Sequence, residues 1–125
     1  MQIYQLPLGA LQTNCYIVPG ADSRAVVIDP ASVTEVEMFL NTHGLTLGTI
    51  ISTHGHYDHF AGAAALQEHS GAKILASAPD EPMYSSAEKC WADFMPVEFR
   101  GIKPDKLYSD GEEFTAEGLK FHVMA

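Results

Sequence analysis

Hydrophobic and polar positions change their period along the chain, and these changes mark the expected elements. Short apolar stretches that alternate or run unbroken, bounded by Gly, Pro and Asp, predict β-strands. Segments with apolar residues three or four positions apart predict helices. The predicted strands cover residues 3–8, 13–18, 25–28, 47–52 and 73–77, and the predicted helices cover residues 32–42 and about 59–68.

The first predicted helix carries signals at both ends. Ser32 is a good N-cap, Glu35 stands three residues later as in a capping box, and Gly44 supplies a stop. The second has small residues at positions 61–65, which allow close packing, and Gly71 ends it. We expect the first helix to cover one face of the sheet with its apolar stripe, Val33, Val36, Phe39 and Leu40.

Strand, helix, strand, helix and strand follow one another, which predicts crossover units and an α/β layer arrangement. The last segment alternates again, with strands expected at residues 106–108, 113–116 and 119–124 and turns at 110–111 and 117–118. It predicts a hairpin. With no internal repeat or linker in the sequence, residues 1–125 are predicted to form a single domain.

Residues 79–104 break the regular pattern, and part of this stretch, 85–94, is predicted to be helical. An excursion rich in aromatic residues and methionine is expected to be satellite core beneath a long loop. The alternative is a wall over a functional site that contacts substrate. The residues concerned are Met83, Tyr84, Trp91, Phe94, Met95 and Phe99.

Composition and charge indicate which binding partners and which cellular location to expect. The formal net charge is −9, with seven basic residues that are scattered, so a nucleic-acid partner is not expected. No apolar run approaches transmembrane length and no signal peptide is visible, so we expect no membrane partner and a cytoplasmic location. Cys15 and Cys90 are too few to predict a disulfide framework, and Cys15 is expected to be a buried thiol.

Three histidines and an aspartate fall within residues 53–59, directly after an apolar run. Imidazole and carboxylate are ligands that zinc prefers. His54 and His56 point to the same side if the segment is extended, whereas Asp58 and His59 are adjacent and diverge. This spacing predicts two neighbouring metal ions. The alternative is that the histidines are ordinary surface or core residues and that Asp58 caps the following helix.

Asp29 stands at the end of the strand 25–28 and could face the histidine loop. There it would orient a ligand histidine through a hydrogen bond. The alternative is a turn-forming aspartate before Pro30. His43, His69 and His122 lie away from the loop and are not expected to be ligands.

The histidine loop resembles the signature of the metallo-β-lactamase superfamily, whose fold is a four-layer αββα sandwich. Residues 13–18 and 26–30 are similar to the glyoxalase II branch, and the resemblance runs from about residue 3 to the end of the chain. It implies that His54 and His56 bind the first metal ion and that Asp58 and His59 bind the second. Asp58 is also expected to orient the nucleophile. Two zinc ions per complete domain are implied, with iron or manganese as alternatives.

The resemblance also implies a reaction. A metal-bound hydroxide would attack an activated carbonyl, and the expected small-molecule substrate is a thioester such as a hydroxyacyl-glutathione, or a related ester. A lactone, or persulfide oxidation at a single iron, are alternatives within the superfamily. The helical domain with which long glyoxalases hold glutathione has no counterpart in this sequence.

The family pattern continues beyond what this sequence contains. A third histidine for the first metal, a bridging aspartate and a last histidine have no counterpart. We therefore expect the chain to form the N-terminal half of the sandwich, as a truncated domain. The alternative is a non-catalytic fragment that cannot complete the dinuclear site. Half a sandwich would leave a sheet face and an edge unpaired, which favours self-association.

Overall fold

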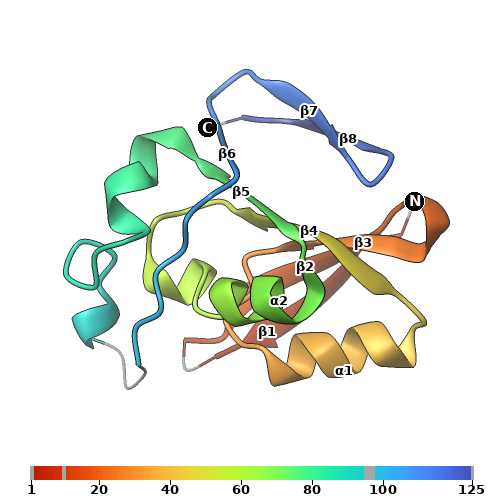
Figure 1. The fold of residues 1–125 in the computed structure, drawn as a ribbon, viewed down its shortest axis with the longest axis horizontal. Coiled ribbons are helices and arrows are strands. Elements are labelled where there is room, and N and C mark those ends of the chain that lie inside the picture. Colours follow the sequence, from red (N-terminus) through yellow and green to blue (C-terminus); the bar gives the residue numbers. More distant parts are fainter. Residues whose placement is uncertain (1, 10, 95–97, 125) are drawn as a thin grey trace.

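The computed structural model describes residues 2–9, 11–94 and 98–124, which form one six-stranded sheet and a separate hairpin (Figure 1). The strand order within the sheet is β1-β2-β3-β4-β5-β6, and β7 pairs with β8. The strands are β1 (Tyr4–Leu8), β2 (Thr13–Pro19), β3 (Arg24–Ile28), β4 (Thr46–Ser52), β5 (Lys73–Ser77), β6 (Lys106–Tyr108), β7 (Glu113–Ala116) and β8 (Leu119–His122). The helices are α1 (Thr34–Thr42) and α2 (Ala63–Ser70), with short 3-10 helices η1 (Ala21–Ser23), η2 (Tyr57–His59), η3 (Ala78–Met83) and η4 (Ala92–Phe94).

Strand direction divides the sheet into two parts. β1, β2 and β3 are antiparallel neighbours, whereas β3, β4, β5 and β6 run parallel. α1 connects β3 to β4 and α2 connects β4 to β5, and both helices lie on the same side of the sheet (Figure 1). The predicted α/β crossover arrangement is therefore confirmed. The predicted C-terminal hairpin is confirmed for β7 and β8, whereas β6 joins the main sheet beside β5.

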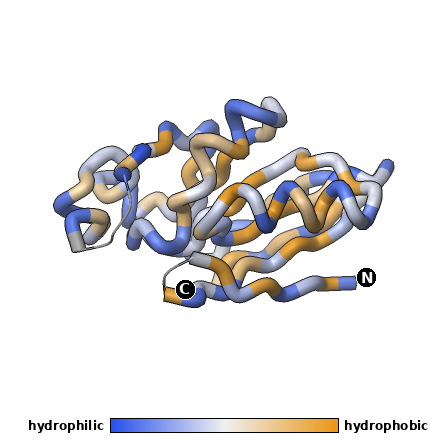
Figure 2. The backbone as a smooth tube through the Cα atoms, turned by 90° about the horizontal axis from the view of Figure 1, so that it is seen from below, coloured by the Kyte–Doolittle hydropathy of each residue, from blue (hydrophilic) through white to orange (hydrophobic). Residues whose placement is uncertain are grey.

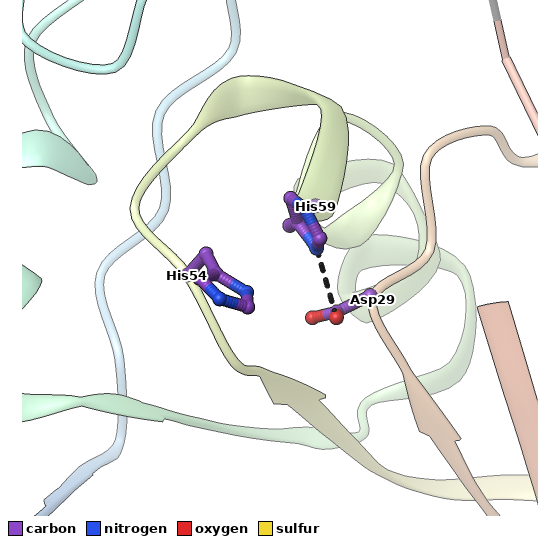
Figure 3. A group of neighbouring side chains, drawn as sticks. All are labelled: Asp29, His54 and His59. Carbon is purple, nitrogen blue, oxygen red and sulfur yellow. Dashed lines mark hydrogen bonds and ion pairs between the residues drawn. The ribbon is translucent and has the colours of Figure 1, made fainter. Parts of the chain in front are cut away.

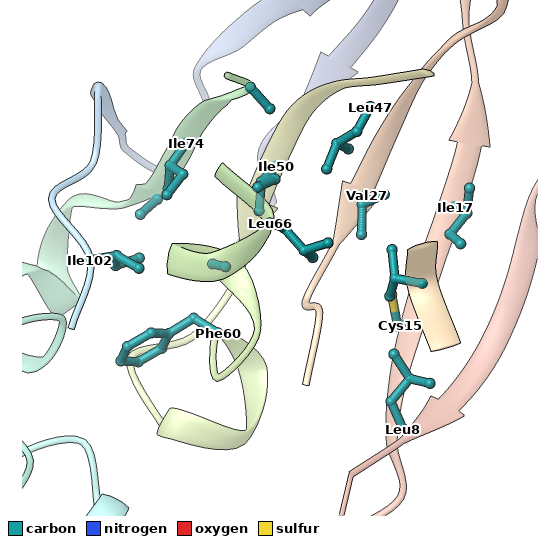
Figure 4. Close-up of a cluster of buried hydrophobic side chains, with 14 of the residues drawn as sticks. Leu8, Cys15, Ile17, Val27, Leu47, Ile50, Phe60, Leu66, Ile74 and Ile102 are labelled. Carbon is teal, nitrogen blue, oxygen red and sulfur yellow. The ribbon is translucent and has the colours of Figure 1, made fainter. Parts of the chain in front are cut away.

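The central strands are buried on both faces, as parallel strands usually are. On β3, Ala25 and Val27 join the core beneath the helices, while Val26 joins the cluster beneath the hairpin. Hydrophobic positions therefore run along the strands (Figure 2). Figure 4 shows the larger core, in which Phe60 and Leu66 pack against the sheet.

The first helix begins differently from the prediction. α1 starts at Thr34, with Val33 at the N-cap position, and no side chain among the described residues caps it. The predicted capping box is wrong because the hydroxyl of Ser32 donates to the carboxylate of Glu35 instead of capping the backbone.

The second helix begins at Ala63, four residues later than predicted. The preceding residues form the 3-10 helix η2 and a turn. The backbone N–H of Gly62 donates to the Pro30 carbonyl at 2.8 Å, so it takes no part in a helical ladder. The predicted stop is confirmed, because Gly71 takes a left-handed conformation with φ of 73° at the C-cap.

The excursion between β5 and β6 holds η3 and η4 in place of the predicted helix over 85–94. Trp91 has a φ of 69°, which no α-helix accommodates. Tyr84 and Cys90 are fully buried and belong to the main core rather than to a separate satellite cluster, whereas Trp91 is exposed. Met95 lies outside the described residues.

The hairpin is fastened to the sheet by Glu117, at its turn. The carboxylate of Glu117 accepts hydrogen bonds from Arg24 Nε at 2.8 Å and from Thr49 Oγ1 at 2.7 Å. A Cβ added at Gly48 would lie 2.4 Å from Glu117 Cδ, and one added at Gly20 would lie 2.3 Å from its carbonyl oxygen. Because Gly20 and Gly48 have no side chain, the backbone and carboxylate of Glu117 can pack against them.

Several single-residue predictions are also settled. Cys15 is fully buried, and burial together with the charge of Asp29 raises the pKa of its thiol to about 12. It is therefore a neutral core residue. His69 and His122 are exposed, as expected, and each lies beside a surface glutamate. None of the helices in the described ranges has the length and apolar character needed to cross a membrane.

Candidate metal centre

The register of two parallel strands brings the candidate residues together. Ile28 of β3 pairs with Ile51 of β4, so both strands end at the same edge of the sheet. The N–H of Asp29 donates to the Ile51 carbonyl at 2.8 Å. Asp29 is therefore placed beside the start of the histidine loop (residues 53–59), which follows β4 directly.

Asp29 is the centre of a hydrogen-bond network at this edge. Its side chain is almost fully buried, and its φ of 57° turns the carboxylate towards the loop. The carboxylate accepts from the Thr53 N–H at 2.7 Å, from Thr53 Oγ1 at 2.5 Å and from His59 Nδ1 at 2.9 Å. The contact with His59 is drawn in Figure 3. The predicted contact between Asp29 and a histidine of the loop is present.

The same network fixes which ring nitrogens can bind a metal. A carboxylate only accepts, so the Thr53 hydroxyl donates its hydrogen to Asp29. Thr53 Oγ1 also lies 2.7 Å from His54 Nδ1 and must accept a hydrogen from that nitrogen. Both His54 and His59 thus carry a hydrogen on Nδ1, and Nε2 is the nitrogen through which the neutral form of each ring would bind a ligand.

Three side chains converge as possible ligands in the described part of the chain. One ligand atom each from Asp29, His54 and His59 lies within 4.8 Å of the other two. Figure 3 shows the three side chains facing a common space. His56 lies outside this group, with its ring centroid 5.7 Å from that of Trp91.

Asp58 lies at the edge of the group. Its Oδ2 is 3.5 Å from His59 Nε2, so the two predicted ligands of the second ion are close neighbours. Thr13 Oγ1, from β2, donates to the same carboxylate oxygen at 2.6 Å. The ligand assignments of His54, His56, Asp58 and His59 remain predictions.

The charges around His59 favour its protonated form in the absence of a metal. The hydrogen bond to Asp29 raises the pKa of His59, and the charges of Asp29 and Asp58 add to this effect. Partial burial acts in the opposite direction. A cation bound near Nε2 would replace that proton in the same negative field.

The donor set fits a divalent metal such as zinc. Imidazole nitrogens and carboxylate oxygens are its usual ligands together with thiolates, and one such atom from each of Asp29, His54 and His59 lies within 4.8 Å of the other two. Zinc-bound histidines commonly donate their other N–H to a carboxylate, and His59 does so to Asp29. Of the four proposed ligands, His54 and His59 belong to this converging group.

Sequence reasoning missed the residues that hold the ligands in place. Thr53 and Thr13 carry no metal-binding signal of their own, although both stand in the segments that carry the family resemblance. Tyr57 was also missed: its buried hydroxyl donates to the Glu98 carbonyl at 2.9 Å and accepts from the Arg100 N–H at 2.8 Å. These contacts join segments far apart in the chain, so only the fold reveals them.

Comparison with known families decides the identity of the domain. The profile described as the metallo-beta-lactamase superfamily matches residues 8–125. The chain belongs to the metallo-beta-lactamase superfamily. The resemblance of the histidine loop to this superfamily's signature is thereby confirmed.

Curated members of the superfamily give similar sequences. The chain is 28% identical over 127 residues to hydroxyacylglutathione hydrolase GloC of Haemophilus influenzae, covering 99% of this chain and 60% of that protein. It is 37% identical over 123 residues to a hydroxyacylglutathione hydrolase of a Synechococcus species, covering 98% of this chain and 41% of that protein. The chain thus spans roughly half the length of these relatives.

Solved structures of the superfamily share the fold. The BLEG-1 B3 metallo-beta-lactamase superposes with a TM-score of 0.85 at 24% identity, over 97% of this chain and 59% of that one. TTHA1623 in a di-iron-bound form superposes with a TM-score of 0.70 at 26% identity, over 89% of this chain and 56% of that one. The predicted superfamily fold is confirmed.

Proposed function

We propose that this domain is part of a metal-dependent hydrolase that cleaves a thioester, such as a hydroxyacyl-glutathione, or a related ester. The observation that carries the proposal is the convergence of His54 and His59 on a common space, with Asp29 fixing the tautomers of both. The substrate class rests on the relatives, whose names are hydroxyacylglutathione hydrolase.

The proposed ligands are His54 and His56 for one metal ion and Asp58 and His59 for another. Zinc is the proposed metal; iron and manganese are alternatives, and TTHA1623 is a relative with two irons. When bound, such an ion lowers the pKa of water and polarises a carbonyl oxygen.

The chain's own residues orient these groups. Asp29 holds the Nδ1 hydrogen of His59 directly and that of His54 through the Thr53 hydroxyl. Thr13 holds Oδ2 of Asp58, and the proposed catalytic role of Asp58 is to orient the nucleophile. Asp29 is almost fully buried, so its carboxylate meets the loop residues rather than bulk solvent.

The proposal is tested by metal content and by thiol release. The chain is purified without chelator, its metal is measured by elemental analysis, and hydrolysis of a hydroxyacyl-glutathione is followed with a thiol reagent. We expect bound zinc or iron and release of thiol. Replacing His56 or His59 by Ala should abolish metal uptake, while His122→Ala, at an exposed strand position, should leave it unchanged.

Each failure has a separate meaning. Metal uptake without thiol release, together with release from a lactone or another ester, would replace the thioester assignment. Metal uptake with no hydrolysis at all would support the non-catalytic reading of this chain. Unchanged metal content in His59→Ala would refute the proposed ligand set.

A further inference from the structure

A second carboxylate reaches the histidine loop from a different element. Asp80 lies in η3, shortly after β5, and its Oδ2 accepts the backbone N–H of Gly55 at 2.9 Å. Gly55 is the residue between His54 and His56. The carboxylate of Asp80 therefore accepts from the His54–Gly55 peptide group, which lies between the two histidines.

Packing presses the loop against η3 at the same point. Gly55 is buried, and a Cβ added to it would lie 2.3 Å from Met83 Sδ and 2.9 Å from Asp80 Cβ. No other side chain fits there without a shift of the backbone. The absence of a side chain at Gly55 is what allows Asp80 to reach its N–H.

The side chain of Asp80 is not used by its own helix. No side chain among the described residues caps η3, whose N-cap position is held by Ser77. Asp80 and His54 instead line the same cavity, of about 620 Å³. A charged acceptor makes a hydrogen bond roughly twice as strong as a neutral one, which suits a contact that must fix a loop.

The loop is thus held at alternate residues. The N–H of Thr53 donates to Asp29, that of Gly55 to Asp80 and that of Tyr57 to the Cys90 carbonyl at 2.8 Å. Of these three contacts, the one at Gly55 lies between two proposed ligands. It holds the His54–Gly55 peptide plane, at the point where the chain passes from one imidazole to the next.

We propose that Asp80 is a positioning residue that fixes the relative orientation of His54 and His56 and thereby sets the affinity of the loop for a divalent metal. The effect on metal affinity rests on the proposed function. The hydrogen bond and its effect on the loop do not.

The first measurement uses the metal-free chain. Amide hydrogen exchange at Gly55 is followed by NMR in the natural chain and in Asp80→Ala, Asp80→Asn and Glu81→Ala. We expect faster exchange at Gly55 in Asp80→Ala alone, because the amide oxygen of Asn still accepts and Glu81 is an exposed neighbour. Asp80→Ser repeats the comparison if Asp80→Ala fails to fold. Equal protection of Gly55 in all variants would overturn the proposal.

The second measurement is zinc affinity, by competition with a chromophoric chelator. We expect Asp80→Ala to bind zinc about 10- to 100-fold more weakly, as is usual when an outer hydrogen-bond partner is lost. Asp80→Asn should restore most of the affinity, and Glu81→Ala should match the natural chain. Equal affinity of Asp80→Ala and the natural chain would refute the positioning role. If the natural chain takes up no zinc, the proposed function fails, and Gly55 exchange still decides whether Asp80 holds the loop.

Discussion

At the residue scale, the candidate metal centre depends on hydrogen-bond acceptors that fix which nitrogen of each histidine ring carries a hydrogen. Asp29 accepts from Thr53 and His59, and this arrangement places a hydrogen on Nδ1 of both His54 and His59. The proposed ligands His54, His56, Asp58 and His59 could be predicted because their residue types and spacing are unusual. Thr13 and Thr53 could not, because threonine occurs everywhere and its role here depends on what it faces.

Trp91 offers a test of whether His56 is a ligand. It is the single tryptophan of the chain, it is exposed, and its ring centroid lies 5.7 Å from that of His56. We expect added Co²⁺ to quench its fluorescence, because a coloured, paramagnetic ion held by His56 would be a close neighbour. His56→Ala should lose the quenching and His122→Ala should keep it. Quenching that persists in His56→Ala would place the ion with Asp29, His54 and His59 alone.

At the element scale, the hairpin packs on the sheet through apolar side chains and is hydrogen-bonded to it through its turn. Glu117 joins β3 and β4 through Arg24 and Thr49, in the space left by two glycines. The alternating pattern predicted the two strands of the hairpin. It could not predict this attachment, because Glu117 is separated from Arg24 by 93 positions in the sequence.

Glu117 should make the free energy of unfolding depend on pH in the acidic range. The hydrogen bonds from Thr49 and Arg24 lower the pKa of Glu117 below its usual 4.5. Its contribution is therefore complete above the pKa of the unfolded chain, near 4.5, and is lost as pH falls through the lower folded value. We expect Glu117→Ala to lose about 1–3 kcal/mol of unfolding free energy at neutral pH, measured with urea, and less in acid. Glu88→Ala, at an exposed carboxylate, is the control, and equal losses at both pH values would contradict this account.

At the scale of the whole molecule, the two faces of the sheet are unequally covered. α1 and α2 cover one face, and the two-stranded hairpin lies over the other (Figure 1). Cavities of about 620 and 380 Å³ flank the hairpin, and the half-buried Phe121 lines both. In the described residues, β7 and β8 pair only with each other.

This open face leads us to expect that the chain associates with a second copy of itself. Exposed apolar residues at its margin, Ile3 and Met124, would be covered in the dimer. Light scattering coupled to size exclusion should show a concentration-dependent mass for the natural chain and a lower mass for Ile3→Glu with Met124→Glu. Met38→Glu, at an exposed position on α1, should not change the mass. A monomer at every concentration would refute the expectation.

The sequence by itself determined the order and type of nearly all strands and helices, because hydrophobic periodicity and glycine or proline stops act locally. It also determined the histidine loop, because closely spaced imidazoles and a carboxylate are chemically distinctive. The start of α2 and the shape of the excursion were decided by distant contacts, such as the bond from Gly62 to the Pro30 carbonyl.

Only the tertiary structure decided how the loop is held. The parallel register of β3 and β4 places Asp29 against Thr53, and η3 places Asp80 against Gly55. Each of these contacts joins residues about 25 positions apart. The local sequence pattern specifies which chemical groups the chain carries. Strand register and packing specify which hydrogen-bond partner each of these groups meets.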